Sequence, residues 1–262
     1  MIVFQTDAPS GLYIFKSNAW TKLNSAPDGT TAGDMLYWNG TAWVRVAAGL
    51  DGQTLTFKNG TPNWKWILPA NTVYSSNNIW MDRNLGATQI ATTSTDVAAY
   101  GDLYQWGRTT DGHQIRTSAT TNTLSNTDAP GNGSFILPSN SPYDWRDAQN
   151  DNLWQGVNGI NNPCPFGFRI PTSAEWNAER LSWNANNSAG GFNSPLKLTV
   201  GGIRLNNYGG FSQVGHYGSY WTSTINQIYA VSLYLADFSS NYASLYNSEY
   251  RSLGMSVRCI KD

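Results

Sequence analysis

The chain has 262 residues, which is enough for one large domain or for a medium domain with a small one. Charged residues make up only 13% of the sequence, and the formal net charge is −1 with no run of lysines and arginines. The sequence therefore lacks the cluster of basic residues that is typical of proteins that bind nucleic acids or anionic membranes. No apolar run approaches the roughly eighteen residues of a membrane span, and the N-terminus lacks the pattern of a signal peptide. We expect no nucleic-acid partner and no membrane insertion.

Residues 1–66 contain a degenerate repeat of aromatic segments, which predicts a small β-hairpin region. Each copy has an aromatic strand, a tight turn and a second strand that carries tryptophan. The copies are LYIFKSNAWTKL at 12–23, LYWNGTAWVRV at 36–46 and LTFKNGTPNWKW at 55–66. Asn39-Gly40 and Asn59-Gly60 are expected to supply the positive φ angles that hairpin turns require. A stalk or collar and a simple spacer are equally good interpretations of such a region.

A lone hairpin is only marginally stable in water. Exposed Trp20, Trp43 and Trp64 would be a liability on a monomer of such low charge. We therefore expect the hairpins to pack on one another, on the following domain or on copies in other chains, and we favour a homotrimer formed through residues 1–66. Their G-x-x-L-Y-x-x-x-x-A-W pattern resembles hairpin repeats near the tips of phage tail fibres and related bacterial surface proteins. Because Met1 directly precedes a strand-like segment, we also expect a fragment of a longer protein.

The composition changes after the hairpins, and we place a second domain over residues 67–262. The expected elements in chain order are a strand entering a turn at 79–87, a short helix within 96–107, a mostly irregular segment at 114–162, and short strands over 196–262. The clearest helix start is at Thr172, because Glu175 three residues later completes a capping box. Glycine pairs at 190–191, 201–202 and 209–210 are expected to mark turns.

Five segments of this second domain resemble one known family in the expected order. They are IWMDRNLG at 79–86, YGDLYQWGR at 100–108, PCPFGFRIPTSAEW at 163–176, YWTST at 220–224 and GMSVRCI at 254–260. The family is the bacterial surface domain first described as the Fibrobacter succinogenes major paralogous domain. The resemblance implies an α+β fold, a variant of the C-type lectin fold shared with formylglycine-generating enzyme, with many short strands and few helices.

The two cysteines have three interpretations under this resemblance. In the C-type lectin fold, one cysteine near the helix region bonds to another on the final strand, and Cys164 and Cys259 occupy those places. The resemblance therefore implies a disulfide, and we expect their Cα atoms within about 7 Å of each other. A reduced structural pair is the alternative. A catalytic pair, as in formylglycine-generating enzyme, is the least favoured, because the two cysteines occupy the places of the lectin-fold disulfide. For other catalytic classes, the sequence lacks a G-x-S-x-G motif and a metal-hydrolase motif.

No metal site and no cofactor is expected. His113 and His216 are the only histidines; a zinc site would need carboxylate or cysteine ligands at suitable spacing, and lone histidines are more often surface or hydrogen-bonded residues. The tripeptides of calcium-dependent lectins do not occur. Asp144, Asp147 and Asp151 offer oxygen ligands for a structural calcium ion, but we favour a solvated acidic loop because no calcium motif supports the ion.

Some members of the resembled group are variable proteins of diversity-generating retroelements. In these, adenine-directed mutagenesis of a C-terminal coding stretch randomises surface residues on a fixed lectin scaffold. Residues 217–251 fit the resulting palette, since they hold seven of the fourteen tyrosines, many serines and no lysine. Gln227 and Glu249 depart from it, because randomised asparagine codons cannot encode them. These two positions would therefore be fixed or differently templated.

Strand alternation selects the outward positions within this stretch. Leu233, Leu235 and Leu245 are expected to face the core and Tyr234 to face away from it. Tyrosine offers a large contact area with few rotatable bonds, while serine and asparagine adapt hydrogen bonds around it. The expected ligand-binding residues are Tyr229, Val231, Tyr234, Phe238, Tyr242, Tyr246, Asn247, Glu249 and Tyr250. The alternative is that these tyrosines fill a β-rich core.

We expect a non-enzymatic receptor-binding or adhesin-type display protein. Its place would be a virion tail fibre or a bacterial cell surface, and its partner a host surface protein or a glycan. A structural cell-surface domain without a dedicated ligand site is the second interpretation, and an enzyme is the third.

Overall fold

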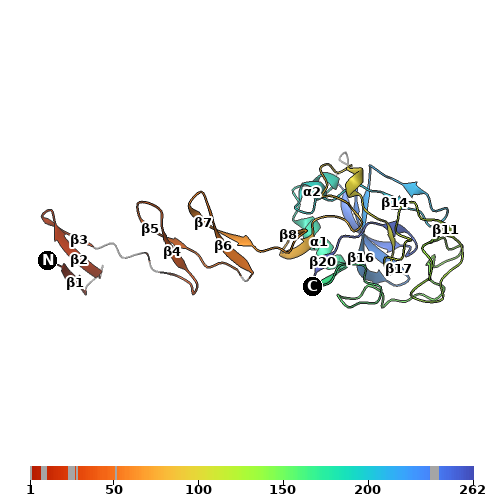
Figure 1. The fold of residues 1–262 in the computed structure, drawn as a ribbon, viewed down its shortest axis with the longest axis horizontal. Coiled ribbons are helices and arrows are strands. Elements are labelled where there is room, and N and C mark those ends of the chain that lie inside the picture. The colour runs from red at the N-terminus through yellow and green to blue at the C-terminus, as the bar shows by residue number, and fades with distance from the viewer. Residues whose placement is uncertain (1, 7–10, 23–26, 28, 51, 237–241) are drawn as a thin grey trace. The chain divides into compact units, whose positions relative to one another are not determined.

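The structure is a computed structural model that describes residues 2–6, 11–22, 27, 29–50, 52–236 and 242–262 (Figure 1). The chain divides into an N-terminal unit, Met1–Ile67, and a C-terminal unit, Leu68–Asp262. This boundary lies one residue from the expected one. No helix in the described ranges is long and apolar enough to cross a membrane.

The N-terminal unit consists of antiparallel strands in three separate sheets of three, two and two strands (Figure 1). The strands are β1 (Ile2–Gln5), β2 (Gly11–Lys16) and β3 (Ala19–Lys22); β4 (Met35–Trp38) and β5 (Trp43–Val46); β6 (Gln53–Lys58) and β7 (Thr61–Trp66). Each repeat copy thus forms a hairpin, and β1 adds a third strand to the first copy.

Two of the hairpin turns are stabilised in different ways. Asn59 and Gly60 both take positive φ, at 51° and 76°, as expected for a two-residue turn. At the β4–β5 turn only Gly40 does so. The Asn39 side chain there accepts hydrogen bonds from the backbone N–H groups of Thr41 at 2.9 Å and Ala42 at 2.8 Å. Asn39 therefore stabilises that turn through its side chain and does not need a positive φ.

The N-terminal unit buries very little of its apolar surface. Among residues 2–67 whose side chains the structure describes, none is buried. Phe4 and Phe57 are each 66% exposed, and Trp38 is 54% exposed. The described side chains of the hairpins form no buried interior, and contacts such as the Trp38–Trp43 ring contact at 5.8 Å and the hydrogen bond from the Trp64 indole N–H to the Ala47 carbonyl oxygen at 2.8 Å stabilise them.

The regular structure of the C-terminal unit consists mostly of short strands, joined by long irregular segments (Figure 1). One sheet has the order β13-β20-β9-β8, from Phe168–Arg169, Ile260–Lys261, Asn78–Met81 and Thr72–Ser75. A second has the order β10-β19-β14-β15, from Tyr104–Gln105, Gly254–Met255, Ile203–Arg204 and Phe211–Ser212. The third joins the longest strands, β16 (Gly218–Asn226), β17 (Tyr229–Leu235) and β18 (Ala243–Glu249). A parallel pair, β11 (Thr120–Thr121) and β12 (Phe135–Ile136), lies in the segment expected to be irregular.

Helix α1 (Ser173–Leu181) begins at the expected capping box. Thr172 Oγ1 accepts a hydrogen bond from the Glu175 N–H at 3.3 Å, and Glu175 Oε2 accepts one from the Thr172 N–H at 2.7 Å. This prediction is confirmed. The capping satisfies two of the N–H groups that a helix start leaves without partners.

Of two other expectations, the short helix within 96–107 is present but brief, and the turn expected at Gly190-Gly191 is wrong. The short helix within 96–107 is only a single 3-10 turn, η1 (Val97–Ala99), because Gly101 takes a φ of 69° and the chain turns away. The glycine pair at 190–191 lies inside a helix, α2 (Ser188–Asn193). A side chain on Gly190 would collide with the carbonyl oxygen of Ala185, so glycine serves close packing there and does not mark a turn.

Tryptophans fill the core of the C-terminal unit and bind its backbone. Trp176 of α1 packs on Trp80 and Tyr220, with ring centroids 4.8 and 5.6 Å apart. On the other side of the core, the indole N–H of Trp106 donates to the carbonyl oxygen of Thr222 at 2.9 Å, and that of Trp221 donates to the carbonyl oxygen of Tyr104 at 2.6 Å. Because each indole joins two segments distant in sequence, the scaffold is held at many points.

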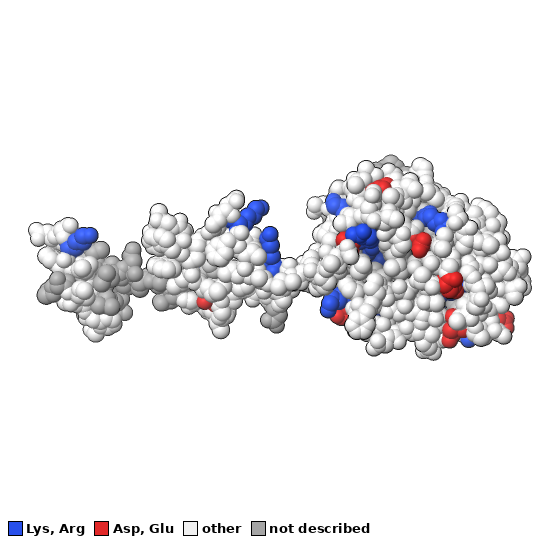
Figure 2. Space-filling view, viewed as in Figure 1, with Lys and Arg blue, Asp and Glu red and all other residues white. Residues whose placement is uncertain are grey.

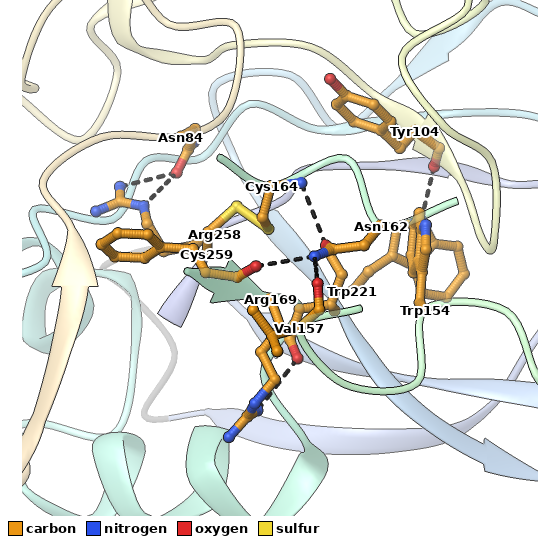
Figure 3. Close-up of a disulfide and its surroundings, with 12 residues drawn as sticks. Asn84, Tyr104, Trp154, Val157, Asn162, Cys164, Arg169, Trp221, Arg258 and Cys259 are labelled. Atoms are coloured by element: carbon orange, nitrogen blue, oxygen red, sulfur yellow. Dashed lines mark hydrogen bonds between the residues drawn. A yellow bond between two sulfur atoms is a disulfide. The ribbon is translucent and has the colours of Figure 1, made fainter. Parts of the chain in front are cut away.

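Cys164 and Cys259 form a disulfide with Cα atoms 5.9 Å apart, which confirms the expected pairing (Figure 3). The bond ties the loop before α1 to the residue that precedes β20. Asn162 shapes this loop: its amide donates to the carbonyl oxygens of Val157 at 2.9 Å and Phe168 at 2.8 Å, and its Oδ1 accepts from the Cys164 N–H at 3.2 Å (Figure 3).

Candidate functional site

One face of the sheet β16-β17-β18 lies in the core. The other face carries tyrosines, although Trp221 of β16, opposite Ser232 on that side, is itself buried in the core. Leu233 pairs with Tyr220 of β16 and with Leu245 of β18, and α1 contacts all three strands. Leu233 and Leu235 are fully buried, as alternation predicted. On the opposite face, Tyr234 pairs with Ser219 and Ser244, and Ser232 pairs with Tyr246. We call this opposite face, with the residues around Tyr250, the tyrosine face.

The first group on the tyrosine face is a row of three rings. Tyr217 stacks on Tyr234 with centroids 5.2 Å apart, and Tyr242 meets Tyr234 edge-on at 6.0 Å. Tyr242, just before β18, is 47% exposed, and Tyr246 within β18 is 48% exposed. These rings support one another and still present their surface to solvent. Tyr217 was not among the expected site residues, although it opens the tyrosine-rich stretch.

The second group surrounds Tyr250. Its ring lies 4.8 Å from that of Tyr143 and 5.8 Å from that of Tyr229. Tyr143 comes from the irregular segment at 114–162, where no periodicity singles out any residue. It has a φ of 55°, which is uncommon for a bulky side chain, and its carbonyl oxygen accepts a hydrogen bond from Ser252 Oγ at 2.5 Å. The left-handed backbone and this anchor fix the direction of the Tyr143 ring.

Glu249 is the one acidic side chain described on the tyrosine face. It is half-buried, and among the described side chains it accepts a hydrogen bond from the Ser232 hydroxyl at 3.4 Å. Burial raises the pKa of Glu249 to about 7, and the Ser232 hydrogen bond lowers it only in part. Near neutral pH this carboxyl is therefore a mixture of the charged and neutral forms.

The remaining expected residues have different outcomes. Asn247 is exposed, and its carbonyl oxygen accepts from the amide of Asn226 at 2.9 Å. Val231 is only 3% exposed, so its assignment as a ligand-binding residue is wrong. It lies two positions from Leu233 on the central strand of the sheet, and side chains two positions apart share a face. Phe238 lies outside the described residues.

A buried arginine, Arg251, follows Tyr250 in the chain. Arg251 is 1% exposed; its Nη2 lies 2.6 Å from Asp151 Oδ1 and its Nη1 3.9 Å from Asp144 Oδ2. Its guanidinium also stacks over the Trp106 ring at 4.8 Å. The expected solvated acidic loop is therefore wrong for Asp144, which is 4% exposed. The described residues contain no His, Cys, Asp and Glu group that could hold a metal ion.

His113 is a structural residue of the interior. It is fully buried, its Nδ1 lies 2.6 Å from Asp111 Oδ1, and its Nε2 accepts from the Gln105 N–H at 3.0 Å. Burial lowers its pKa to about 4 despite the Asp111 carboxylate. Nδ1 therefore carries the proton toward Asp111, and the ring is neutral at physiological pH.

Compared with models of known families, with curated proteins and with solved structures, the chain matches none of them.

Proposed function

We propose that this chain is a non-enzymatic binding protein whose tyrosine face recognises a partner on another cell or particle. One observation carries the proposal: aromatic rings stand partly exposed on one face of a sheet whose other face is anchored in the core. Such rings provide a large contact surface, and little side-chain entropy is lost when they bind. A packed sheet also holds them in place before the partner arrives.

The fold that we propose for the C-terminal unit is C-type-lectin-like. Several features support it: many short strands with two described α-helices, a capping-box helix packed on a three-stranded sheet, and a disulfide from the loop before that helix to the residue preceding the last strand. The disulfide also favours an oxidising location, as on a virion tail fibre or a bacterial surface. No enzymatic role is part of the proposal.

We further propose that the tyrosine face varies between relatives, as in the variable proteins of diversity-generating retroelements. Gln227 and Glu249, which randomised asparagine codons cannot encode, support this proposal because both have structural roles that would keep them fixed. Gln227 takes a φ of 55° in the β16–β17 turn, and its carbonyl oxygen accepts from Arg251 at 3.2 Å. Glu249 is half-buried against Ser232. In sister isolates, differences concentrated at Tyr234, Tyr242 and neighbouring outward positions support this; evenly scattered differences contradict it.

Truncating the central tyrosines tests the binding role. Fluorescently labelled wild-type protein and its Tyr246→Ala and Tyr242→Ala variants are titrated onto a panel of bacterial cells and followed by flow cytometry. On the surface that wild type binds, each truncation of a hot spot should cost about 2 kcal/mol or more, or roughly thirtyfold in affinity. Thermal stability should change little, because both side chains are about half exposed.

Phe166→Ala is the matched control, since Phe166 is an exposed aromatic residue in the loop before β13 and outside the tyrosine face. It should bind like wild type. Equal losses in all three variants, or a sharp fall in melting temperature for the tyrosine variants, would show that these rings do not form a recognition surface.

A further inference from the structure

A cavity of about 270 Å³ opens beside Tyr250 at the margin of the tyrosine face. It is lined by Pro138, Tyr143, Leu205, Asn206, Asn207 and Tyr250. Three segments far apart in sequence therefore meet here, and only Tyr250 was among the expected binding residues. The volume lies just below the usual range for small-molecule sites, so the cavity suits one ring of a ligand and not a long chain.

The cavity combines aromatic faces with hydrogen-bonding groups that the protein leaves unused. The amide of Asn206 donates to Ser252 Oγ at 3.0 Å, which leaves its carbonyl oxygen as an acceptor. The Asn207 amide and the hydroxyls of Tyr143 and Tyr250 have no hydrogen-bond partner among the described residues. A ligand that fills the cavity must satisfy these groups, because a polar group that loses water without gaining a partner weakens binding.

One serine orders both walls of the cavity. Ser252 is fully buried; its hydroxyl donates to the carbonyl oxygen of Tyr143 at 2.5 Å and accepts from Asn206 at 3.0 Å. The carbonyl oxygen of Ser252 in turn accepts from the amide of Gln105 in the core at 2.8 Å. The aromatic wall and the amide wall are thus tied to each other and to the scaffold, which is the arrangement of a preformed site.

The lining is uncharged. Asp144 and Arg251 adjoin Tyr143 and Tyr250 in sequence, but both are buried and face each other at 3.9 Å. Figure 2 shows charged residues scattered over the visible face of the C-terminal unit, most of which carries none. A ligand with a net charge would find no opposite charge in the lining, so the cavity favours a neutral one.

We propose that this cavity binds a single neutral sugar ring of a surface glycan. A pyranose has an apolar C–H face that can pack on a tyrosine ring and hydroxyls that each donate and accept, which matches the amide and phenol groups. A proline or aliphatic side chain of a protein would fill the volume but leave those groups without partners. The inference rests on the proposed function and deepens it by naming the class of ligand.

Nuclear magnetic resonance of the full chain with ring-¹³C-labelled tyrosine tests this directly. The probes are the methyl glycosides of glucose, galactose, mannose and N-acetylglucosamine. Glucuronic acid serves as a charged comparison ligand, and an octaproline peptide serves as a peptide comparison ligand. At least one methyl glycoside should bind with a Kd on the order of 1 mM, as expected for one ring, and shift the Tyr143 and Tyr250 signals. Shifts confined to other tyrosines, no binding by any glycoside, or equal binding of glucuronic acid or octaproline would overturn the inference.

Two variants test whether the glycoside binds in this cavity, and both keep the aromatic rings of its lining. Asn207→Leu keeps the side-chain volume at an exposed position, and Tyr143→Phe keeps the ring. We expect Asn207→Leu to weaken glycoside binding about tenfold and Tyr143→Phe several-fold, the loss of a hydrogen bond each. Phe166→Ala, outside both the cavity and the tyrosine face, should bind the glycoside like wild type. Undiminished binding by both cavity variants would contradict the assignment.

The same proteins separate this inference from the proposed function. If Tyr246→Ala loses cell binding while no glycoside binds wild type, the tyrosine face recognises something else and only the sugar site is wrong. If a glycoside binds in the cavity but wild type binds no cell surface, the proposed function is wrong and the sugar site stands.

Discussion

Glu249 shows how one side chain on the tyrosine face can give the stability of the protein a pH dependence. Its folded pKa is raised to about 7 from an ordinary value of 4.5. The folded state therefore binds more protons than the unfolded state between those values. The contribution to stability is fully present below about pH 4.5 and is lost as the pH rises through about 7.

Replacing Glu249 with Gln should remove this loss. We expect Glu249→Gln to match wild type near pH 4.5 and to exceed it above pH 7 by up to about 3 kcal/mol in free energy of unfolding. Urea denaturation at a series of pH values measures the difference. Asp147→Asn is the control, because Asp147 is exposed, and it should give no such pH-dependent gain. A Glu249→Gln difference that stays constant with pH contradicts the argument.

His113 has the opposite effect on the pH dependence of stability, and it is present in both wild type and Glu249→Gln. Its folded pKa is lowered to about 4, so the unfolded state binds more protons between about 4 and 6.5. Its contribution is present above about pH 6.5 and is lost as the pH falls through about 4. In wild type the two residues partly offset each other, and Glu249→Gln should therefore reveal a steeper rise of stability with pH than wild type shows.

The candidate site was predictable from the sequence only where strand alternation applies. Leu233 and Leu235 alternate with Tyr234, and their burial follows from that pattern. The same pattern assigns Val231 to the buried side, so its inclusion as a ligand-binding residue neglected its own periodicity. Tyr143 could not be found in this way. Its position depends on a left-handed backbone and on a hydrogen bond from Ser252, more than a hundred residues later.

At the scale of elements, α2 is a helix that its own composition does not favour. Its sequence is SAGGFN, and glycine costs about 1 kcal/mol relative to alanine inside a helix. The Asn187 side chain caps it by accepting from the Gly190 N–H at 3.1 Å, and the Ser188 N–H donates to the carbonyl oxygen of Ala236 at 2.9 Å. In α2, tertiary contacts thus outweigh low helix propensity. By contrast, the capping box of α1 predicts that helix from the sequence alone.

Alanine at Gly190 should destabilise the protein although alanine is the better helix former. The added Cβ would collide with the Ala185 carbonyl oxygen, a backbone atom that cannot turn away. We expect a loss of about 1–3 kcal/mol in urea denaturation. Gly191→Ala is the matched control, since its Cβ would meet side-chain atoms of Leu235 and Trp183 at 3.3 Å, which can shift slightly. A stability gain for Gly190→Ala would show that α2 relaxes freely.

At the scale of the whole molecule, the disulfide closes a long stretch of chain. Cys164 and Cys259 are 95 residues apart, and a crosslink over that distance restricts the unfolded chain by about 4–5 kcal/mol. We expect the Cys164→Ser, Cys259→Ser double variant to lose stability of that order in urea denaturation. Wild type treated with a reductant should lose a similar amount. If thiol titration shows full reduction and the unfolding midpoint does not move, the crosslink contributes nothing to stability.

The N-terminal unit predicts self-association of the full chain. Its described side chains have no buried core, and rings such as Trp38 and Phe57 are more than half exposed. Packing against other copies would bury them, so we expect sedimentation velocity to show a trimer at micromolar concentration. Trp38→Lys should weaken the assembly. The same change at Phe166 in the C-terminal unit should not. A clean monomer of wild type would contradict the prediction.

The repeats predicted the hairpins because each hairpin is local: its turn residues and paired strands lie within about a dozen residues. The sheets of the C-terminal unit join segments such as β9 and β20 that are far apart in sequence. No local pattern encodes that pairing. The family resemblance supplied an expectation for the disulfide, but alternation and capping alone do not predict which strands meet.

The low number of charged residues near the tyrosine face also predicts how the proposed binding depends on salt concentration. Within residues 217–251 the only charged side chains are Asp237, Glu249 and Arg251. Ions in solution screen attractions between charges over about 10 Å at moderate salt, but they leave aromatic packing and amide hydrogen bonds largely unaffected. Long-range steering is weak on such a surface, so encounters proceed by unassisted diffusion. Binding through the tyrosine face, as proposed, should therefore depend only weakly on salt concentration.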